Sequence, residues 1–145
     1  MAELSCEIVI DATPAIIFPY LTDPELHVQW MGTTATLDPR PGGDWRVLAG
    51  GVHPGVGTFV EVVPDERVVF TFGWDEPEHP IPAGSTEVEI TLVPDGDKTL
   101  VRLTHRGLPE DAVGDHTYGW NHYLARLSTA TTGGDAGQDT LGSDG

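Results

Sequence analysis

Strict alternation of apolar and polar residues marks the first element of the chain. Every second residue from position 4 to position 10 is apolar: Leu4, Cys6, Ile8 and Ile10. A period of two is typical of a β-strand with one buried face, because successive side chains point to opposite sides of a sheet. The pattern therefore predicts a strand over residues 4–10.

Two short helices are predicted after this strand, because two helix-start signals follow in quick succession. Thr13 precedes a proline, which is typical of an N-cap and the first helical position, and residues 22–25 repeat the signal. Pro19 falls inside the first helix and is expected to kink or truncate it, since proline lacks an amide hydrogen. Gly32 ends the second helix.

The region 33–106 returns to the period of two and is divided by turns rich in glycine and proline. We count six strands in it. Each has one apolar and one polar face, as in an antiparallel sheet with one side in water. The segment 74–84 contains three prolines and is expected to form a loop at the rim of the sheet.

The period becomes helical after Pro109, and the residues beyond 130 lose their apolar content. One stripe of the predicted helix carries His116, Trp120, Tyr123, Leu124 and Leu127. Polar and glycine-rich composition predicts a disordered tail over residues 131–145. We therefore expect a single domain over residues 1–130 and a tail behind it.

These elements in sequence predict an α+β fold. A curved antiparallel sheet of about seven strands is expected to wrap around the long C-terminal helix, with two short helices after the first strand. Such a sheet leaves space between its concave face and the helices. That space is the natural place for an apolar ligand.

The balance of charges excludes one class of partner. The chain carries 23 acidic and 7 basic residues, a formal net charge of -16, so phosphate backbones and anionic membrane surfaces repel it. No segment approaches the roughly 20 apolar residues of a membrane span, and the N-terminus lacks the regions of a signal peptide. We expect a cytoplasmic protein that binds no nucleic acid and inserts into no membrane.

Several segments resemble the motifs of one known family, in the same order along the chain. They are residues 18–31, 41–47, 57–72, 84–86, 99–107 and 116–120. The chain is similar over residues 4–130 to the family of homologues of the heat-shock protein ATPase activator, within the START-like, Bet v-like superfamily. The resemblance implies a helix-grip fold with an internal cavity. It implies less about activity, because relatives include co-chaperone domains, lipid carriers, polyketide cyclases and oxygenase domains.

Histidines are the first candidates for chemistry in the cavity. The chain has six, but no spacing places two of them on one face, so we expect neither a metal nor a cofactor. His105 continues the inward phase of its strand and His116 shares the apolar helix stripe, so the two are expected to meet near one end of the cavity. Either they act on a ligand as acid, base or hydrogen-bond donor, or each bonds to backbone at the sheet–helix junction.

Glu61 is the second candidate, and the alternation leaves its direction open. If Phe59 faces the cavity, Glu61 faces it too, and its carboxylate would act as a proton acceptor or polar anchor. If Val60 and Val62 face inward instead, Glu61 lies in water.

Aromatic residues supply the expected walls of the cavity, unless they are plain core packing. The predicted ligand-binding set, with the candidates above, is Trp30, Met31, Trp45, Phe59, Glu61, Phe70, Phe72, Trp74, His105, His116, Trp120 and Tyr123.

The leading hypothesis is a non-enzymatic protein that encloses a small hydrophobic or aromatic molecule, such as a lipid or polyketide. The first alternative is a cyclase or dehydratase in which Glu61, His105 or His116 moves a proton. The second is a module that contacts a chaperone or another protein. No serine or cysteine nucleophile with a base is visible and no phosphate-binding loop, so we assign no catalytic residue. The sequence leaves the oligomeric state open.

Overall fold

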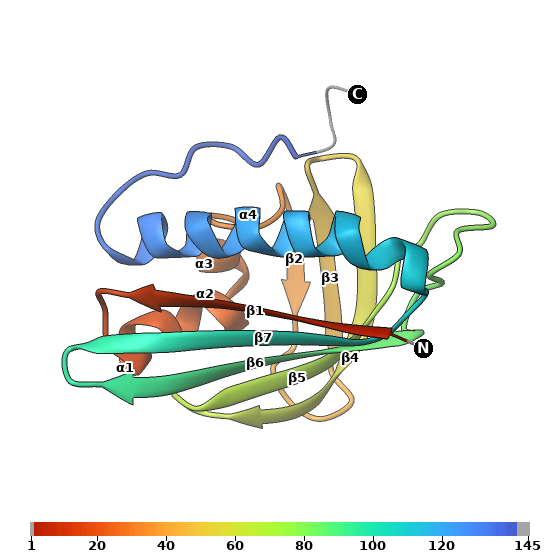
Figure 1. Cartoon of the computed structure of the whole chain (residues 1–145). Coiled ribbons are helices and arrows are strands. Elements are labelled where there is room, and N and C mark those ends of the chain that lie inside the picture. Colours follow the sequence, from red (N-terminus) through yellow and green to blue (C-terminus); the bar gives the residue numbers. More distant parts are fainter. Residues whose placement is uncertain (1, 142–145) are drawn as a thin grey trace.

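One antiparallel sheet forms the body of the protein in a computed structural model that describes residues 2–141 (Figure 1). Its strands are β1 (Ala2–Ile10), β2 (Ala35–Leu37), β3 (Asp44–Ala49), β4 (His53–Val63), β5 (Arg67–Phe72), β6 (Thr86–Asp95) and β7 (Lys98–Leu108). Their spatial order is β1-β7-β6-β5-β4-β3-β2, and every neighbouring pair is antiparallel. The predicted curved sheet of about seven strands is confirmed.

The long helix α4 (Val113–Thr131) runs along one face of the sheet beside β1 and β7, after a single 3-10 turn η1 (Glu110–Ala112) (Figure 1). Trp120, Tyr123, Leu124 and Leu127 are buried on its sheet side. The helical stripe in the sequence therefore marks the face that packs on the core. Sheet, long helix and short helices together form the predicted helix-grip fold.

Three short helices follow β1, where two were expected. They are α1 (Pro14–Ile17), α2 (Pro19–Thr22) and α3 (Pro24–His27), and each begins with a proline. Pro19 divides the first predicted helix into two because its ring fits only the start of a helix. Asp23 caps α3 through its Oδ1, which accepts the Glu25 amide at 2.9 Å. No helix among residues 2–141 is long and apolar enough to cross a membrane.

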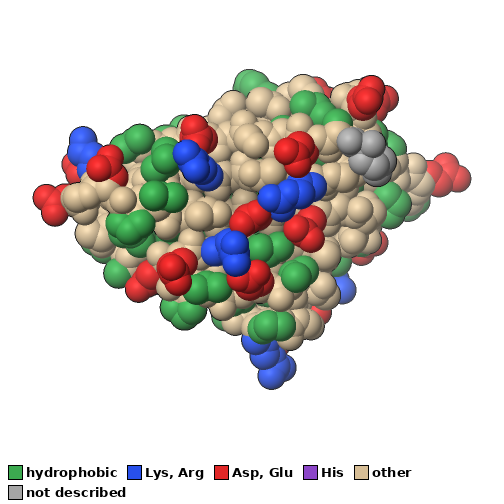
Figure 2. All heavy atoms as spheres, turned by 60° about the horizontal axis from the view of Figure 1, so that its bottom comes forward, with side chains coloured by type: hydrophobic (Ala, Val, Ile, Leu, Met, Phe, Trp, Pro, Cys, Tyr) green, Lys and Arg blue, Asp and Glu red, His purple; other side chains and the backbone are tan. Residues whose placement is uncertain are grey.

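The outer face of the sheet is polar and carries paired charges. Arg106 lies between Glu89, at 2.6 Å, and Glu87, at 3.3 Å, while Arg67 joins Glu61 and Glu89. Figure 2 shows basic and acidic side chains interspersed on this face. The sheet therefore has one wet and one buried side, as the alternation predicts.

The prediction of a disordered tail is wrong for residues 132–141, which pack on the domain. This segment turns back over α4 and packs along it (Figure 1). The Arg126 guanidinium donates to the carbonyls of Ala136 and Gly137, both at 2.7 Å, and Asp139 is only 1% exposed. We call residues 132–141 the C-terminal strap. The last part of the predicted tail, residues 142–145, lies outside the described residues.

Candidate functional site

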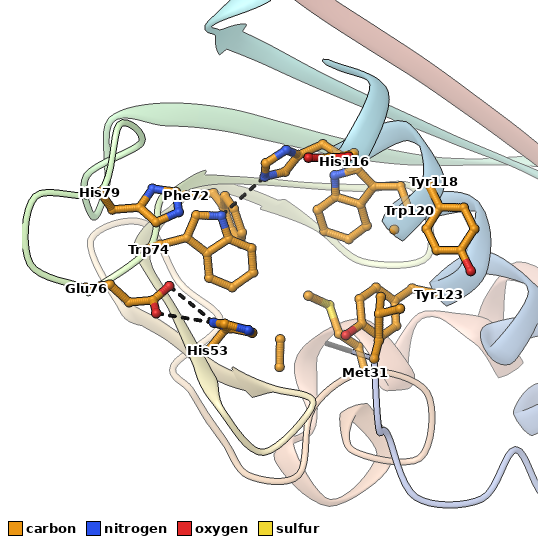
Figure 3. A pocket seen from close by; sticks show the side chains of 14 residues that line it. Met31, His53, Phe72, Trp74, Glu76, His79, His116, Tyr118, Trp120 and Tyr123 are labelled. Atoms are coloured by element: carbon orange, nitrogen blue, oxygen red, sulfur yellow. Dashed lines mark hydrogen bonds and ion pairs between the residues drawn. The ribbon is translucent and has the colours of Figure 1, made fainter. Parts of the chain in front are cut away.

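A cavity of about 440 Å³ opens beside α4, between the turn after β3, the end of β5 and the rim segment 74–79 (Figure 3). Four aromatic side chains form its walls: Phe72, Trp74, Trp120 and Tyr123. Phe72 and Trp74 meet edge to face, with ring centres 5.0 Å apart. Volumes of roughly 300–1,000 Å³ are usual for small-molecule sites. The cavity is therefore large enough for an aromatic molecule of two or three rings.

Polar side chains gather at the mouth of the cavity. His53 at the start of β4 contacts Glu76 of the rim segment, with Nδ1 3.2 Å from Oε2. His79 accepts the Ile81 amide at its Nδ1, at 3.0 Å. Tyr118 lies across the cavity from them, on α4, and is 69% exposed (Figure 3). We call His53, Glu76, His79, Asp115 and Tyr118 the mouth residues; all line the cavity.

Two histidines lie at the inner end of the rim, with ring centres 5.6 Å apart. The indole of Trp74 donates to Nε2 of His116 at 3.2 Å, and Nδ1 of His116 donates to the Ala112 carbonyl at 2.9 Å. The indole of Trp120 donates to Nδ1 of His105 at 3.0 Å. Each imidazole accepts a hydrogen bond at one nitrogen, so the arrangement fits the neutral ring.

His105 does not line the cavity, although it lies next to His116. Its Nε2 is 2.8 Å from the hydroxyl of Thr86, which in turn donates to the Phe72 carbonyl at 2.6 Å. Burial, with a smaller contribution from the repulsion that two protonated rings would exert on each other, lowers the pKa of His105 to about 3. His105 therefore ties α4 to β6, whereas His116 faces the cavity and also bonds to backbone.

Four predicted wall residues lie in the core and do not border this cavity. Trp45 stacks on Phe70 with ring centres 4.4 Å apart, and Trp30 and Phe59 are both 1% exposed. The gap among Trp30, Trp45 and Phe70 has no room for a water molecule. These aromatic residues correspond to the alternative of plain core packing.

Glu61 points away from the cavity. In β4 the register shifts between Phe59, which pairs with Phe70, and Glu61, which pairs with Val69. Such a bulge inserts one extra residue and reverses the phase of the alternation. Glu61 consequently lies on the outer face in its ion pair with Arg67, with 42% of its side chain exposed. The expectation that it would anchor a ligand is wrong.

The C-terminal strap closes one side of the cavity. Leu141 lines the wall, and Asp139 behind it accepts the amides of Gly32 and Gly50 and the hydroxyl of Tyr123, at 2.7, 3.0 and 2.9 Å. Burial opposes the charge of Asp139, but these donors hold its pKa below the usual range. Burial and this carboxylate raise the pKa of Tyr123, so its hydroxyl stays a donor.

Six of the twelve predicted site residues border the cavity: Met31, Phe72, Trp74, His116, Trp120 and Tyr123. None of the mouth residues was predicted as a site residue. The sequence predicted only the rim loop that carries two of them, Glu76 and His79. It also missed Ala49, Gly119 and Leu141. Leu141 had a visible signal, because an isolated leucine in a polar tail is a candidate anchor. His53 and Glu76 had none, since they are far apart in sequence.

The fold and the cavity together define a helix-grip protein of the START-like class. The family model described as Activator of Hsp90 ATPase homolog 1-like protein matches residues 11–132. The chain therefore belongs to this family. A comparison with curated proteins finds no match.

Solved structures agree with this assignment. The AHSA1-like protein RHE_CH02687 from Rhizobium etli is 42% identical, over 96% of this chain and 84% of that one, with a TM-score of 0.71. The Aha1 dimer from Colwellia psychrerythraea is 23% identical, over 92% and 98%, with a TM-score of 0.79. PFC0360w, an HSP90 activator from Plasmodium falciparum, is 19% identical, over 88% and 94%, with a TM-score of 0.71. The last two likenesses concern the fold alone.

Proposed function

We propose that the protein binds a small aromatic or hydrophobic molecule in the cavity beside α4. The observation that carries the proposal is the cavity of about 440 Å³ walled by Phe72, Trp74, Trp120 and Tyr123. Apolar ring surface facing a space of this size loses contact with water when a ligand enters. The polar mouth residues would then orient the part of the ligand that stays near solvent.

Binding is better supported than catalysis. A proton-transfer enzyme requires a base that is free to accept a proton from the ligand. Both ring nitrogens of His116 are engaged by Trp74 and Ala112, and Glu61 lies on the opposite side of the sheet. His105 lies behind the wall. The candidates for the cyclase or dehydratase alternative are therefore occupied or displaced.

The test uses two glycines of α4 as a matched pair. A Cβ at Gly119 would meet only Leu141, at 3.9 Å, so Gly119→Leu places its side chain in the cavity. Gly114 lies on the same helix with nothing within 4 Å, so Gly114→Leu is the control. Both changes replace a poor helix former by a good one. Binding is followed by tryptophan fluorescence during titration with naphthalenemethanol, flavonoids and fatty acids.

We expect saturable quenching by naphthalenemethanol or a flavonoid at micromolar concentrations in the parent protein and in Gly114→Leu. Gly119→Leu should weaken binding by more than about tenfold, because the leucine and a ligand compete for one space. Flat titrations with every compound, or equal binding by the two variants, would overturn the proposal.

Such a negative result would favour the second candidate, an interaction with a chaperone. Family membership supports it, as does the fold shared with the HSP90 activator of Plasmodium falciparum. Native mass spectrometry of the protein mixed with a purified chaperone of this kind decides it. A complex of the two masses supports the interaction, and two separate masses oppose it.

A further inference from the structure

The charged groups that face the cavity are all of one sign. Glu76 and Asp115 lie at its mouth, and no lysine or arginine lines it within residues 2–141. The chain has only seven basic residues, and several are engaged elsewhere. Arg67, Arg102 and Arg106 pair with glutamates on the outer face of the sheet, and Arg126 donates to backbone carbonyls.

The aromatic walls behind this mouth also favour a positively charged group. The faces of tryptophan and tyrosine rings carry partial negative charge and attract ammonium groups. Trp74, Trp120 and Tyr123 all present ring surface to the cavity (Figure 3). An ammonium group in this space would meet ring faces as well as carboxylates.

Glu76 retains capacity for a ligand. Its two oxygens lie 3.2 and 3.3 Å from the same atom, Nδ1 of His53, so one donor serves both. A carboxylate offers about four lone-pair positions. With 33% of the side chain exposed, the remaining positions are open to a group that enters through the mouth.

We propose that the cavity selects ligands that join an aromatic body to a positively charged amine, over anions of the same shape. The inference deepens the binding function proposed above and rests on it. At a pH where the lining histidines are neutral, a fatty-acid carboxylate at the mouth would face Glu76 and Asp115 with no lysine or arginine beside it, within a protein of net charge -16. Free fatty acids are therefore the class that this cavity rejects.

The experiment compares three probes that share one ring system and differ in charge. Naphthylmethylamine is cationic, naphthalenemethanol is neutral and naphthoate is anionic. Their dissociation constants are measured by isothermal titration calorimetry at low salt, at a pH above the range in which most histidines are protonated. We expect the amine to bind about tenfold tighter than the alcohol, and the carboxylate about tenfold weaker. Added salt should reduce both differences, because the mouth is partly exposed.

A matched pair of variants locates the preference. Glu76→Gln removes a charge from the mouth at constant shape and should bring the amine and the alcohol within about threefold of each other. Glu78→Gln removes the same charge two residues away, on an exposed side chain that does not line the cavity, and should keep the preference.

The outcomes separate the two proposals. If the alcohol binds as tightly as the amine, or the carboxylate binds tightest, ligand binding stands and charge selection is wrong. If the two variants lose the preference equally, the general field of the protein selects the amine and the assignment to Glu76 is wrong. If none of the three probes binds, and the titrations with flavonoids and fatty acids are flat as well, both proposals fail.

Discussion

Trp74 and His116 join the rim segment to the long helix at the edge of the cavity. The indole Nε1 of Trp74 donates to Nε2 of His116 at 3.2 Å, and the two rings lie 6.2 Å apart between centres (Figure 3). Since His116 also bonds to the Ala112 carbonyl through Nδ1, its tautomer is fixed from both sides. One wall of the cavity thus depends on a hydrogen bond between elements 42 residues apart.

Trp74→Phe removes the donor and keeps an aromatic ring. The free energy of unfolding should fall by about 1–2 kcal/mol, because Nε2 of His116 loses its partner and the ring becomes smaller. Nitrogen NMR of the imidazole should show the proton on Nδ1 in the parent protein and a mixture of tautomers in the variant. A parent protein with the proton on Nε2 of His116 would contradict the arrangement.

The alternation in the sequence predicted the sheet well because it reports burial directly. Along β7, Val101, Leu103 and His105 are all fully buried, in the phase that their spacing requires. The same logic left the direction of Glu61 open in β4, where a bulge separates Phe59 from Glu61. Residues 59–63 contain no glycine or proline to mark the bulge. The two possible alternations both place at least one valine on the inner face, so hydrophobicity does not choose between them. The register of the partner strand β5 decides the outcome, and a local window of sequence does not contain it.

Glu61→Gln tests this correction. The ion pair with Arg67 is about 40% exposed on both sides, so its loss should change the free energy of unfolding by less than about 1 kcal/mol. Affinity for an aromatic ligand should stay unchanged, because the side chain is on the other face of the sheet. The buried neighbour is the contrast, and Phe59→Ala should cost about 3–5 kcal/mol in urea unfolding. Loss of ligand binding in Glu61→Gln would return this residue to the cavity.

Two buried histidines predict how stability depends on pH. Burial lowers the pKa of His27 to about 4, against a bond to the Met31 carbonyl, and lowers that of His105 to about 3. In the unfolded chain both titrate near 6.5, so the unfolded state binds protons first as the pH falls. The folded state is therefore fully stable above about pH 6.5 and loses stability below it.

The slope of the free energy of unfolding against pH measures this effect. Each histidine should contribute a loss of about 1.4 kcal/mol per pH unit between pH 6.5 and its own folded pKa, so that the pair contributes about 3 kcal/mol per unit near pH 5. Urea unfolding at several pH values between 7 and 5 checks it. His105→Gln should reduce the slope by about half. A stability that is constant over this range would show that the two imidazoles gain protons without opposing the fold.

Amino-acid composition predicted disorder where the C-terminal strap is ordered, because composition averages over a whole segment. Residues 132–141 are mostly polar, and two side chains hold them: Arg126 donates to the carbonyls of Ala136 and Gly137, and Asp139 accepts the amides of Gly32 and Gly50. Those two amides lie 107 and 89 residues away, so no window around the tail contains them. The isolated leucine marks Leu141 as a candidate anchor, but the sequence does not show which part of the fold it contacts.

Gly50 allows a matched test of the strap. It has φ +62°, and a Cβ there would come within 2.0 Å of the Leu141 carbonyl oxygen. Gly96, in the β6–β7 hairpin, has φ +61° with nothing within 4 Å. Gly96→Ala should cost only the strain of a left-handed residue, about 1–2 kcal/mol. Gly50→Ala should cost this and also displace the strap, so that hydrogen exchange of residues 138–141 accelerates and the cavity widens on the side of Leu141. If the two variants lose the same stability and exchange alike, the strap does not rest on Gly50.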